Sequence, residues 1–253
     1  ATGQNLVPRT NLLSFNLTTG ALSSFAPSLN GQVKALALSP DGTRLYAGGA
    51  FTQVNGKTRW LIAAFNTATG DLLETFKPSV GGSYINSIVA TNSAVYVGGL
   101  IGAGNGVARK NLVAFDTSGN LLGWAPTTDL QVDTMVMNTS GSKLIVGGRF
   151  ATVNDVSQRG LAALSPSDGS LLPWDVTNTV KNGSNTSPYI GKAGIYALSN
   201  DGNAVYGTGW VYANATIGHL EGCFSADPAT GAIKWIEDCH GDTYGAYSDG
   251  GTV

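Results

Sequence analysis

The chain has 253 residues, of which 42% are hydrophobic and only 12% are charged, well below the roughly 25% charged residues usual in soluble domains. Its formal net charge of −2 argues against binding to nucleic acid or to an anionic membrane surface, and no apolar run is long enough to cross a bilayer. The 35 glycines and the scarcity of charge favour an all-β protein with many tight turns, and they suit a protein that works outside the cell.

The chain opens on a hairpin pattern that returns at a fixed spacing. Residues 9–16 form an apolar run, Thr19-Gly20 marks a turn, and a second apolar run ends near Pro27. Two short apolar runs around a glycine turn are typical of a β-hairpin. The same sequence pattern begins at Arg9, Arg59, Arg109 and Arg159, in steps of 50 residues.

A second hairpin lies between these copies. In its first copy, residues 33–38 lead through Ser39-Pro40-Asp41-Gly42 into residues 44–49. Pro followed by Asp-Gly is a turn signal, because Pro presets φ and Gly accepts a positive φ. The early copies end in Gly-Gly, which permits a close backbone approach or a β-bulge. The later copies cover residues 84–99, 132–148 and 194–209.

Each period therefore holds four short strands, and four-stranded repeats of about 50 residues predict the blades of a β-propeller. We predict an all-β fold, a propeller of four-stranded antiparallel blades that forms a single domain over residues 1–253. A parallel β-helix is the competing solenoid, but its repeat is shorter. The predicted units are residues 9–27 (partial), 33–78, 84–126, 132–175, 194–238 and 243–253 (partial).

Two residue types recur at fixed places in the repeat. The arginine before the third strand of each unit is expected to tie the preceding loop to backbone carbonyls or to the adjacent blade. Aromatic residues recur near the end of the fourth strand, and we expect them to pack between blades rather than to form a binding platform. They are Phe25, Phe76, Trp124, Trp174 and Trp235.

The unit over residues 194–238 departs from the pattern. The connection that leads into it, residues 175–193, is longer than its counterparts, and its own second loop carries Trp210, Tyr212 and His219. In a propeller these two loops share one rim, and irregular loops on a regular scaffold often carry binding sites. We therefore expect ligand contacts here; a surface insertion without function is the alternative.

The end of this unit carries the two cysteines and a cluster of polar residues. Folding the hairpin over residues 220–239 brings Cys223 near Cys239, so we expect a disulfide, which would imply an oxidising compartment; two buried thiols are the alternative. His240, Asp242 and Tyr244 follow. Their spacing matches no metal or catalytic motif, so we predict ligand contact, with no catalytic residue, no metal and no cofactor.

The repeat Gly-Gly-x-Phe-Thr-x-Val-Asn-Gly-x-x-Arg, as in residues 48–59, resembles the repeats of secreted actinobacterial β-propeller proteins, and residues 238–244 resemble a recurrent segment of the same proteins. Similar repeats occur in minor tail proteins of phages that infect such bacteria. The resemblance covers nearly the whole chain. It implies a ring of six or seven blades that is secreted, or lies on a cell surface or a virion. Residues 100–104 depart from the motif, which argues against one identical site per blade.

The pattern supplies about five blades, so we expect an incomplete ring that a further chain or a missing segment completes; a five-bladed closure is the rival. The chain starts at Ala1 without a signal-peptide pattern, which suggests a processed chain.

We expect an extracellular, non-catalytic binding module that holds a carbohydrate or protein partner. A structural subunit of a phage tail tip or surface particle is the alternative, and a hydrolase or lyase acting through His240 and Asp242 is the third possibility. The expected contact residues are Trp210, Tyr212, His219, His240, Asp242 and Tyr244.

Overall fold

The computed structural model describes residues 8–212, 220–239, 241–248 and 253. These residues form successive antiparallel sheets and one short 3-10 helix, η1 (Asp175–Asn178), with no α-helix among them. The all-β prediction is therefore confirmed. Among the predicted contact residues, His219 and His240 lie outside the described residues.

Four main sheets follow one another along the chain. Sheet I contains β1 (Val33–Leu38), β2 (Arg44–Gly49) and β5 (Ile62–Asn66). Sheet II contains β6 (Val80–Ala90), β7 (Ala94–Gly104), β8 (Val107–Ala108) and β9 (Leu112–Asp116). Sheet III contains β10 (Val132–Met137), β11 (Leu144–Gly148), β14 (Leu161–Leu164) and β15 (Leu171–Leu172). Sheet IV contains β16 (Ala193–Asn200), β17 (Val205–Val211), β18 (Gly222–Ala226) and β19 (Ile233–Asp238).

The fourth strand of the repeat is reduced to a bridge in the early units. Leu72 pairs with Phe65 at the edge of sheet I, and Leu121 pairs with Phe115 at the edge of sheet II. Before sheet I, the bridge between Phe15 and Leu22 closes the hairpin of residues 9–27, which we call the N-terminal hairpin. This hairpin matches the outer half of a repeat unit.

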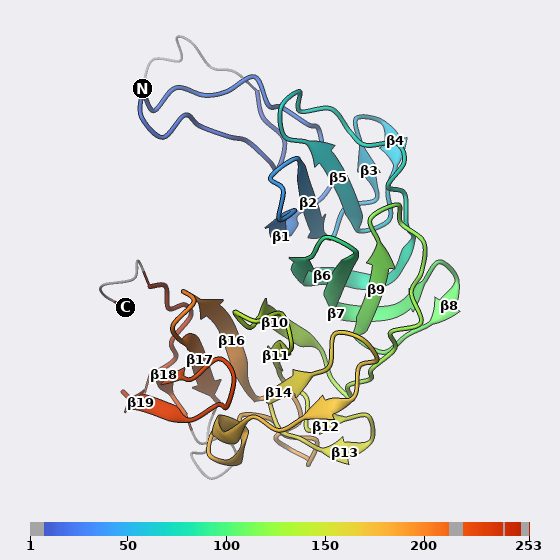
Figure 1. Ribbon diagram of the computed structural model, residues 1–253. Helices are drawn as coiled ribbons and strands as arrows, with labels where there is room; N and C mark the ends of the chain where they lie inside the picture. Colours follow the sequence, from blue (N-terminus) through green and yellow to red (C-terminus); the bar gives the residue numbers. More distant parts are fainter. Residues whose placement is uncertain (1–7, 213–219, 240, 249–252) are drawn as a thin grey trace.

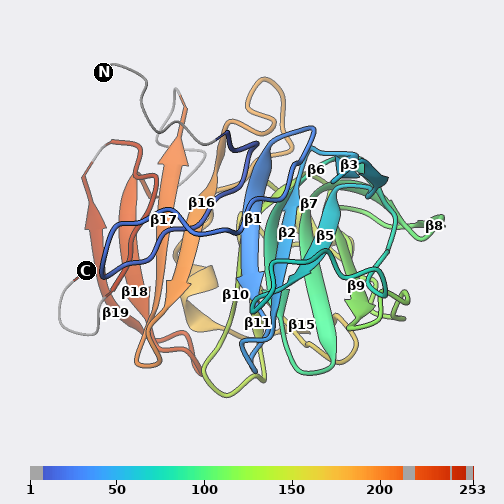
Figure 2. The same ribbon diagram turned by 90° about the horizontal axis from the view of Figure 1, so that it is seen from above.

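The sheets follow an arc. Figure 1 shows β1, β6, β10 and β16 on its inner side, while β5, β9, β14 and β19 lie on its outer side. The inner strands of successive sheets contact one another. Figure 2 shows the strands from the side, where most of them run lengthwise between the top and the bottom of the view. The N-terminal hairpin and sheet IV are the two ends of the arc.

Apolar side chains fill the space between successive sheets. Separate buried clusters lie between sheets I and II, between II and III, and between III and IV. Three of the aromatic residues expected between blades are found there: Phe76 packs edge-on against Tyr46, Trp124 packs against Tyr96, and Trp174 lies in the third cluster. Trp235, on the last strand of sheet IV, is only partly buried and belongs to none of these clusters, because no described sheet follows it. A further cluster joins the N-terminal hairpin to sheet I.

The Gly-Gly pair has a separate packing reason for each glycine. In all four sheets the register between the first two strands shifts at the same place, a β-bulge in the first strand. A Cβ on Gly49 would lie 2.0 Å from the carbonyl oxygen of Gln32 at this bulge, whereas a Cβ on Gly48 would lie 2.6 Å from a methyl carbon of Ile85 in sheet II. One glycine accommodates the bulge and the other receives a side chain of the next sheet.

The second loop of the first three units carries a small hairpin. In sheet I it consists of β3 (Gln53–Val54) and β4 (Lys57–Thr58), and in sheet III of β12 (Thr152–Val153) and β13 (Val156–Ser157). Asn55 and Gly56 both have positive φ, 51° and 75°, as a two-residue turn of the primed type requires.

Three of the recurrent arginines form bonds within their own unit. Arg9 donates to the carbonyl oxygen of Ser23 at 2.9 Å, and Arg109 to that of Leu122 at 3.1 Å. Arg59 is buried and pairs with the Glu74 carboxylate at 2.7 Å. The arginines therefore have the structural role that the repeat suggests.

The expected disulfide is absent, because Cys223 and Cys239 are both free thiols. Cys223 pairs with Glu237 across β18 and β19, while the Cys239 amide donates to the carbonyl oxygen of Glu221. The cysteines are thus diagonal neighbours, and such pairs are separated by roughly 7–8 Å, beyond the usual Cα separation of a disulfide. If β19 were shifted by two residues along β18, Cys239 would lie directly opposite Cys223.

Candidate functional site

The β-bulges place one extra residue per sheet at the same level of the inner strands. These four residues, which we call the bulge row, are Lys34, Asn86, Asp133 and Tyr196. A bulged residue leaves the regular alternation of its strand, so its side chain is re-aimed. Since the bulge recurs, the four side chains follow one another along the inner side of the arc.

The first three members of the bulge row are joined by hydrogen bonds. The Lys34 ammonium donates to Asn86 Oδ1 at 3.1 Å and also lies 4.4 Å from the centre of the Tyr84 ring. The Asn86 amide donates to Asp133 Oδ1 at 3.2 Å. Sheets I, II and III are therefore connected by polar side chains as well as by their apolar clusters.

Asp133 is the most enclosed charge of the row. Burial raises its pKa above the ordinary value of 3.8, although hydrogen bonds from Gln131 and the positive charge of Arg149 oppose this rise. Gln131 Nε2 donates to Asp133 Oδ1 at 2.5 Å, and Arg149 Nε lies 3.2 Å from Oδ2. Its oxygens thus have protein donors and serve to hold Arg149 in place.

An aromatic stack continues the row at sheet IV. The Tyr196 ring lies between those of Trp210 and Tyr244, with ring centres 5.2 and 4.8 Å away and interplanar angles of 26° and 29°. The Arg149 guanidinium lies 5.0 Å from the centre of the Trp210 ring. The order Asp133, Arg149, Trp210, Tyr196, Tyr244 therefore links sheet III to the segment that follows sheet IV.

The two ends of the stack differ in exposure. Trp210 is buried, and its indole N–H has no hydrogen-bond partner within the described part of the chain. Tyr244 is 69% exposed at the other end. Burial raises the pKa of Tyr196 in the middle, and nearby Tyr244 and Asp242 add to the rise. The stack thus offers one accessible ring, Tyr244, supported by the half-buried Tyr196 and the buried Trp210.

The structure brings three of the predicted contact residues together and leaves one apart. Trp210 and Tyr244 share the stack around Tyr196, and Asp242 is exposed near the same tyrosine. Tyr212 is exposed beside the long connection, where Lys192 lies 5.2 Å from the centre of its ring. His219 and His240 fall outside the described residues.

The long connection over residues 175–193 is pinned to sheet IV. Asn182 is fully buried within it, and its side-chain amide donates to the carbonyl oxygen of Leu220 at 2.6 Å. Arg159 Nε donates to the carbonyl oxygen of Gly183. The connection is therefore held to the segment before β18 and, through Arg159, to the segment before β14 of sheet III.

Sequence reasoning missed Tyr196, Arg149 and the rest of the bulge row. The signal that could have located the row is positional. Each member follows the residue that pairs with Gly49, Gly99, Gly148 or Gly209, which is the last glycine of the Gly-Gly pair or of its Gly-Thr-Gly counterpart in sheet IV. The four side chains share no residue type, so the repeat does not reveal them by composition.

The described residues show neither a metal cluster nor a membrane helix. In these ranges no three His, Cys, Asp or Glu side chains lie close enough to hold a metal ion. No described helix is long and apolar enough to cross a bilayer.

The sequence matches no protein-family model and no curated protein. Among solved structures, it is similar to a chain of the mitotic checkpoint complex, with a TM-score of 0.54, 13% identity and 90% of this chain covered. It is also similar to the extracellular domain of a one-component system from B. thetaiotaomicron, with a TM-score of 0.52, 14% identity and 89% covered. The chain spans 60% of the first of these chains and 25% of the second. At such identities the likeness concerns the β-sheet fold alone.

Proposed function

We propose that this chain is an arc of a β-propeller and serves as an extracellular, non-catalytic binding module that holds a polysaccharide. The propeller assignment is supported by four sheets that share one strand order, one bulge position and an inner first strand. Under this proposal, the complete propeller contains five or more blades. The observation that carries the binding function is the aromatic stack that ends at the exposed Tyr244.

The stack suits a sugar for physical reasons. The flat C–H face of a pyranose packs on an aromatic ring, and a tyrosine also offers a hydroxyl for hydrogen bonding. Because Tyr196 and Trp210 support the Tyr244 ring from behind, it loses less conformational freedom when a ligand binds. Asp242 supplies an exposed hydrogen-bond acceptor close by.

A pair of tyrosine variants tests the proposal. Tyr244→Ala removes the accessible ring of the stack, whereas Tyr247→Ala removes a neighbouring tyrosine that is 78% exposed and makes no ring contact among the described residues. We expect the wild-type chain and Tyr247→Ala to be retained on insoluble polysaccharides such as cellulose, chitin or peptidoglycan. Tyr244→Ala should lose at least tenfold in affinity.

Two outcomes would contradict the proposal. One is the absence of binding by the wild-type chain across a glycan array and the insoluble polymers. The other is equal weakening by Tyr244→Ala and Tyr247→Ala, which would show that the stack has no special part. Circular dichroism of both variants checks that the fold is retained.

A second function, as a structural subunit of a larger assembly, is favoured by a different observation. Leu36 and Leu38 are more than half exposed on one face of sheet I. Adjacent large apolar side chains on a surface often mark an interface with another protein. Isolation of the native protein as a stable complex would support this function.

A further inference from the structure

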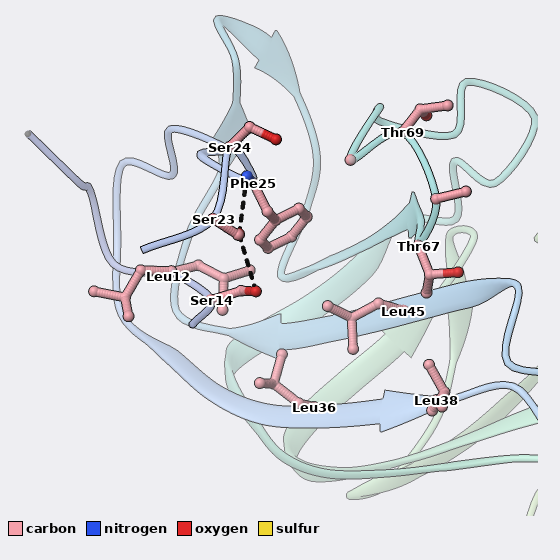
Figure 3. Close-up of a pocket in the computed structure, with 13 residues that line it drawn as sticks. Leu12, Ser14, Ser23, Ser24, Phe25, Leu36, Leu38, Leu45, Thr67 and Thr69 are labelled. Carbon is pink, nitrogen blue, oxygen red and sulfur yellow. Dashed lines mark hydrogen bonds between the residues drawn. The ribbon is translucent and has the colours of Figure 1, made fainter. Parts of the chain in front are cut away.

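An apolar groove lies at the N-terminal end of the arc. It has a volume of about 490 Å³, and Figure 3 shows Leu36, Leu38 and Leu45 of sheet I on one side, with Phe25 and Leu12 of the N-terminal hairpin on the other. The three leucines share one face, because Leu36 and Leu38 are two residues apart on β1 and Leu45 pairs with Leu38.

The same positions are covered in the sheets that follow. Strand register makes Leu36 equivalent to Ile88 of sheet II and Met135 of sheet III. Ile88 and Met135 are each 6% exposed, whereas Leu36 is 52% exposed. Leu45 is half-buried, and its counterparts Val95 and Leu144 are fully buried. Leu36 of sheet I is thus the equivalent of an interface side chain, but no neighbouring sheet packs against it among the described residues.

In the sheets that follow, the side chain equivalent to Leu36 packs over a glycine of the preceding sheet. Ile88 packs over Gly48 of the preceding sheet, where a Cβ would come within 2.9 Å of its Cδ1 atom. Met135 packs over Gly98 in the same way, and a Cβ there would come within 3.1 Å of its sulfur. In both cases the second strand of the preceding sheet presents glycine to the large side chain.

The outer half of the missing sheet is already present. The N-terminal hairpin occupies it, since Phe25 packs edge-on against Phe65 of β5 with ring centres 5.6 Å apart. Phe25 and Leu12 also line the groove, so the groove continues an established interface toward the inner side of the arc. What remains uncovered is the place of a first and a second strand.

We propose that this groove is the docking site for an antiparallel β-strand pair of a partner polypeptide, whose second strand presents glycine to Leu36. The four such pairs among the described residues, β1–β2, β6–β7, β10–β11 and β16–β17, each belong to their own sheets. The inference goes beyond the proposed polysaccharide site and does not use the aromatic stack. The docked pair completes the sheet that the N-terminal hairpin begins and buries the three leucines.

The chain itself supplies a probe for this site. A labelled peptide of residues 84–99 carries the β6–β7 pair with Gly98, and a disulfide added beyond its ends keeps it as a hairpin, since isolated hairpins are marginally stable. We expect saturable binding to the wild-type protein in fluorescence anisotropy. Leu36→Asp in the protein should weaken binding at least tenfold, and Gly98→Val in the peptide should do the same.

Three outcomes would overturn the proposal. The first is a lack of saturable peptide binding to a well-folded protein. The second is equal binding of the glycine and valine peptides. The third is a wild-type dimer in light scattering that Leu36→Asp converts to a monomer, which would make a second copy the occupant. Polysaccharide retention, measured on the same Leu36→Asp protein, separates failure of this inference from failure of the proposed function.

Discussion

The two faces of sheet I both carry apolar side chains, but only one of them is fully covered by a neighbouring sheet. Toward sheet II, Tyr46 and Phe76 are fully buried in a continuous apolar cluster. On the opposite face, Leu36 and Leu38 meet the groove and are more than half exposed. The strand pattern is equally apolar on both faces. Burial in this repeat is therefore a property of the interface between two units rather than of either unit, as in repeat proteins generally.

The largest expected effect comes from truncating equivalent residues at a covered and an uncovered joint. Ile88→Ala should destabilise the protein by about 3 kcal/mol, because a buried aliphatic side chain leaves a cavity. Leu36→Ala should cost less than about 1 kcal/mol, because its side chain is half exposed. Urea unfolding followed by tryptophan fluorescence measures both. Equal losses in the two variants would mean that the uncovered face of sheet I is covered in solution.

A smaller effect compares an enclosed carboxylate with one in an open turn. Burial raises the pKa of Asp133, whereas hydrogen bonds from the backbone and side chain of Ser170, together with Ser165, lower the pKa of Asp168 to about 2. Carboxyl-carbon NMR should therefore show Asp133 titrating above 3.8 and Asp168 near pH 2. The reverse order would mean that the contacts of Asp133 with Gln131 and Arg149 outweigh its burial.

These two shifts act on stability with opposite signs. Between its folded pKa and 3.8, folded Asp168 binds fewer protons than the unfolded chain, so its contribution to stability is lost as the pH falls through this window. Folded Asp133 binds more protons than the unfolded chain just above 3.8, so it favours folding increasingly as the pH falls through that range. Asp168→Asn and Asp133→Asn should change the pH dependence of unfolding in opposite directions.

The smallest effect concerns the two thiols and leaves the fold unchanged. Cys239 is exposed, whereas Cys223 is partly buried, and burial raises the pKa of the Cys223 thiol. Since the thiolate is the reactive form, a thiol reagent should modify Cys239 faster than Cys223. Mass spectrometry of the native protein under non-reducing conditions should show both thiols free. A mass lower by two hydrogens would instead demonstrate the disulfide.

The repeated parts of the fold could be predicted because their signals are local. Glycine turns, apolar runs and the Gly-Gly pair recur every 50 residues, and the structure contains the corresponding strands and bulges. The aromatic packing of Phe76 and Trp124 followed from their position in the repeat. Each of these features is set by residues within one unit and is then repeated.

The site was only partly predictable, because it depends on register between units. The sequence singles out Trp210, Tyr244 and Asp242, whose role as ligand contacts stays a prediction. It does not single out Tyr196, whose ring stacks between those of Trp210 and Tyr244, because Tyr196 lies at a bulge that its residue type does not mark. The same limit explains the cysteines, where the pairing of Cys223 with Glu237 separates the two sulfurs. Strand identity can be predicted from local pattern, whereas single-residue register requires the neighbouring strand.

The bulge row has a consequence for how this scaffold can change. A side chain at the bulge leaves the packed alternation of its strand, and the four positions already hold an amine, an amide, a carboxylate and a phenol. Substitution there alters the chemistry lining the inside of the arc and the polar contacts of the bulge row, while the apolar clusters between the sheets stay intact. Selection, or an engineer building a library, can therefore vary the polar groups at these four positions without redesigning the hydrophobic interior.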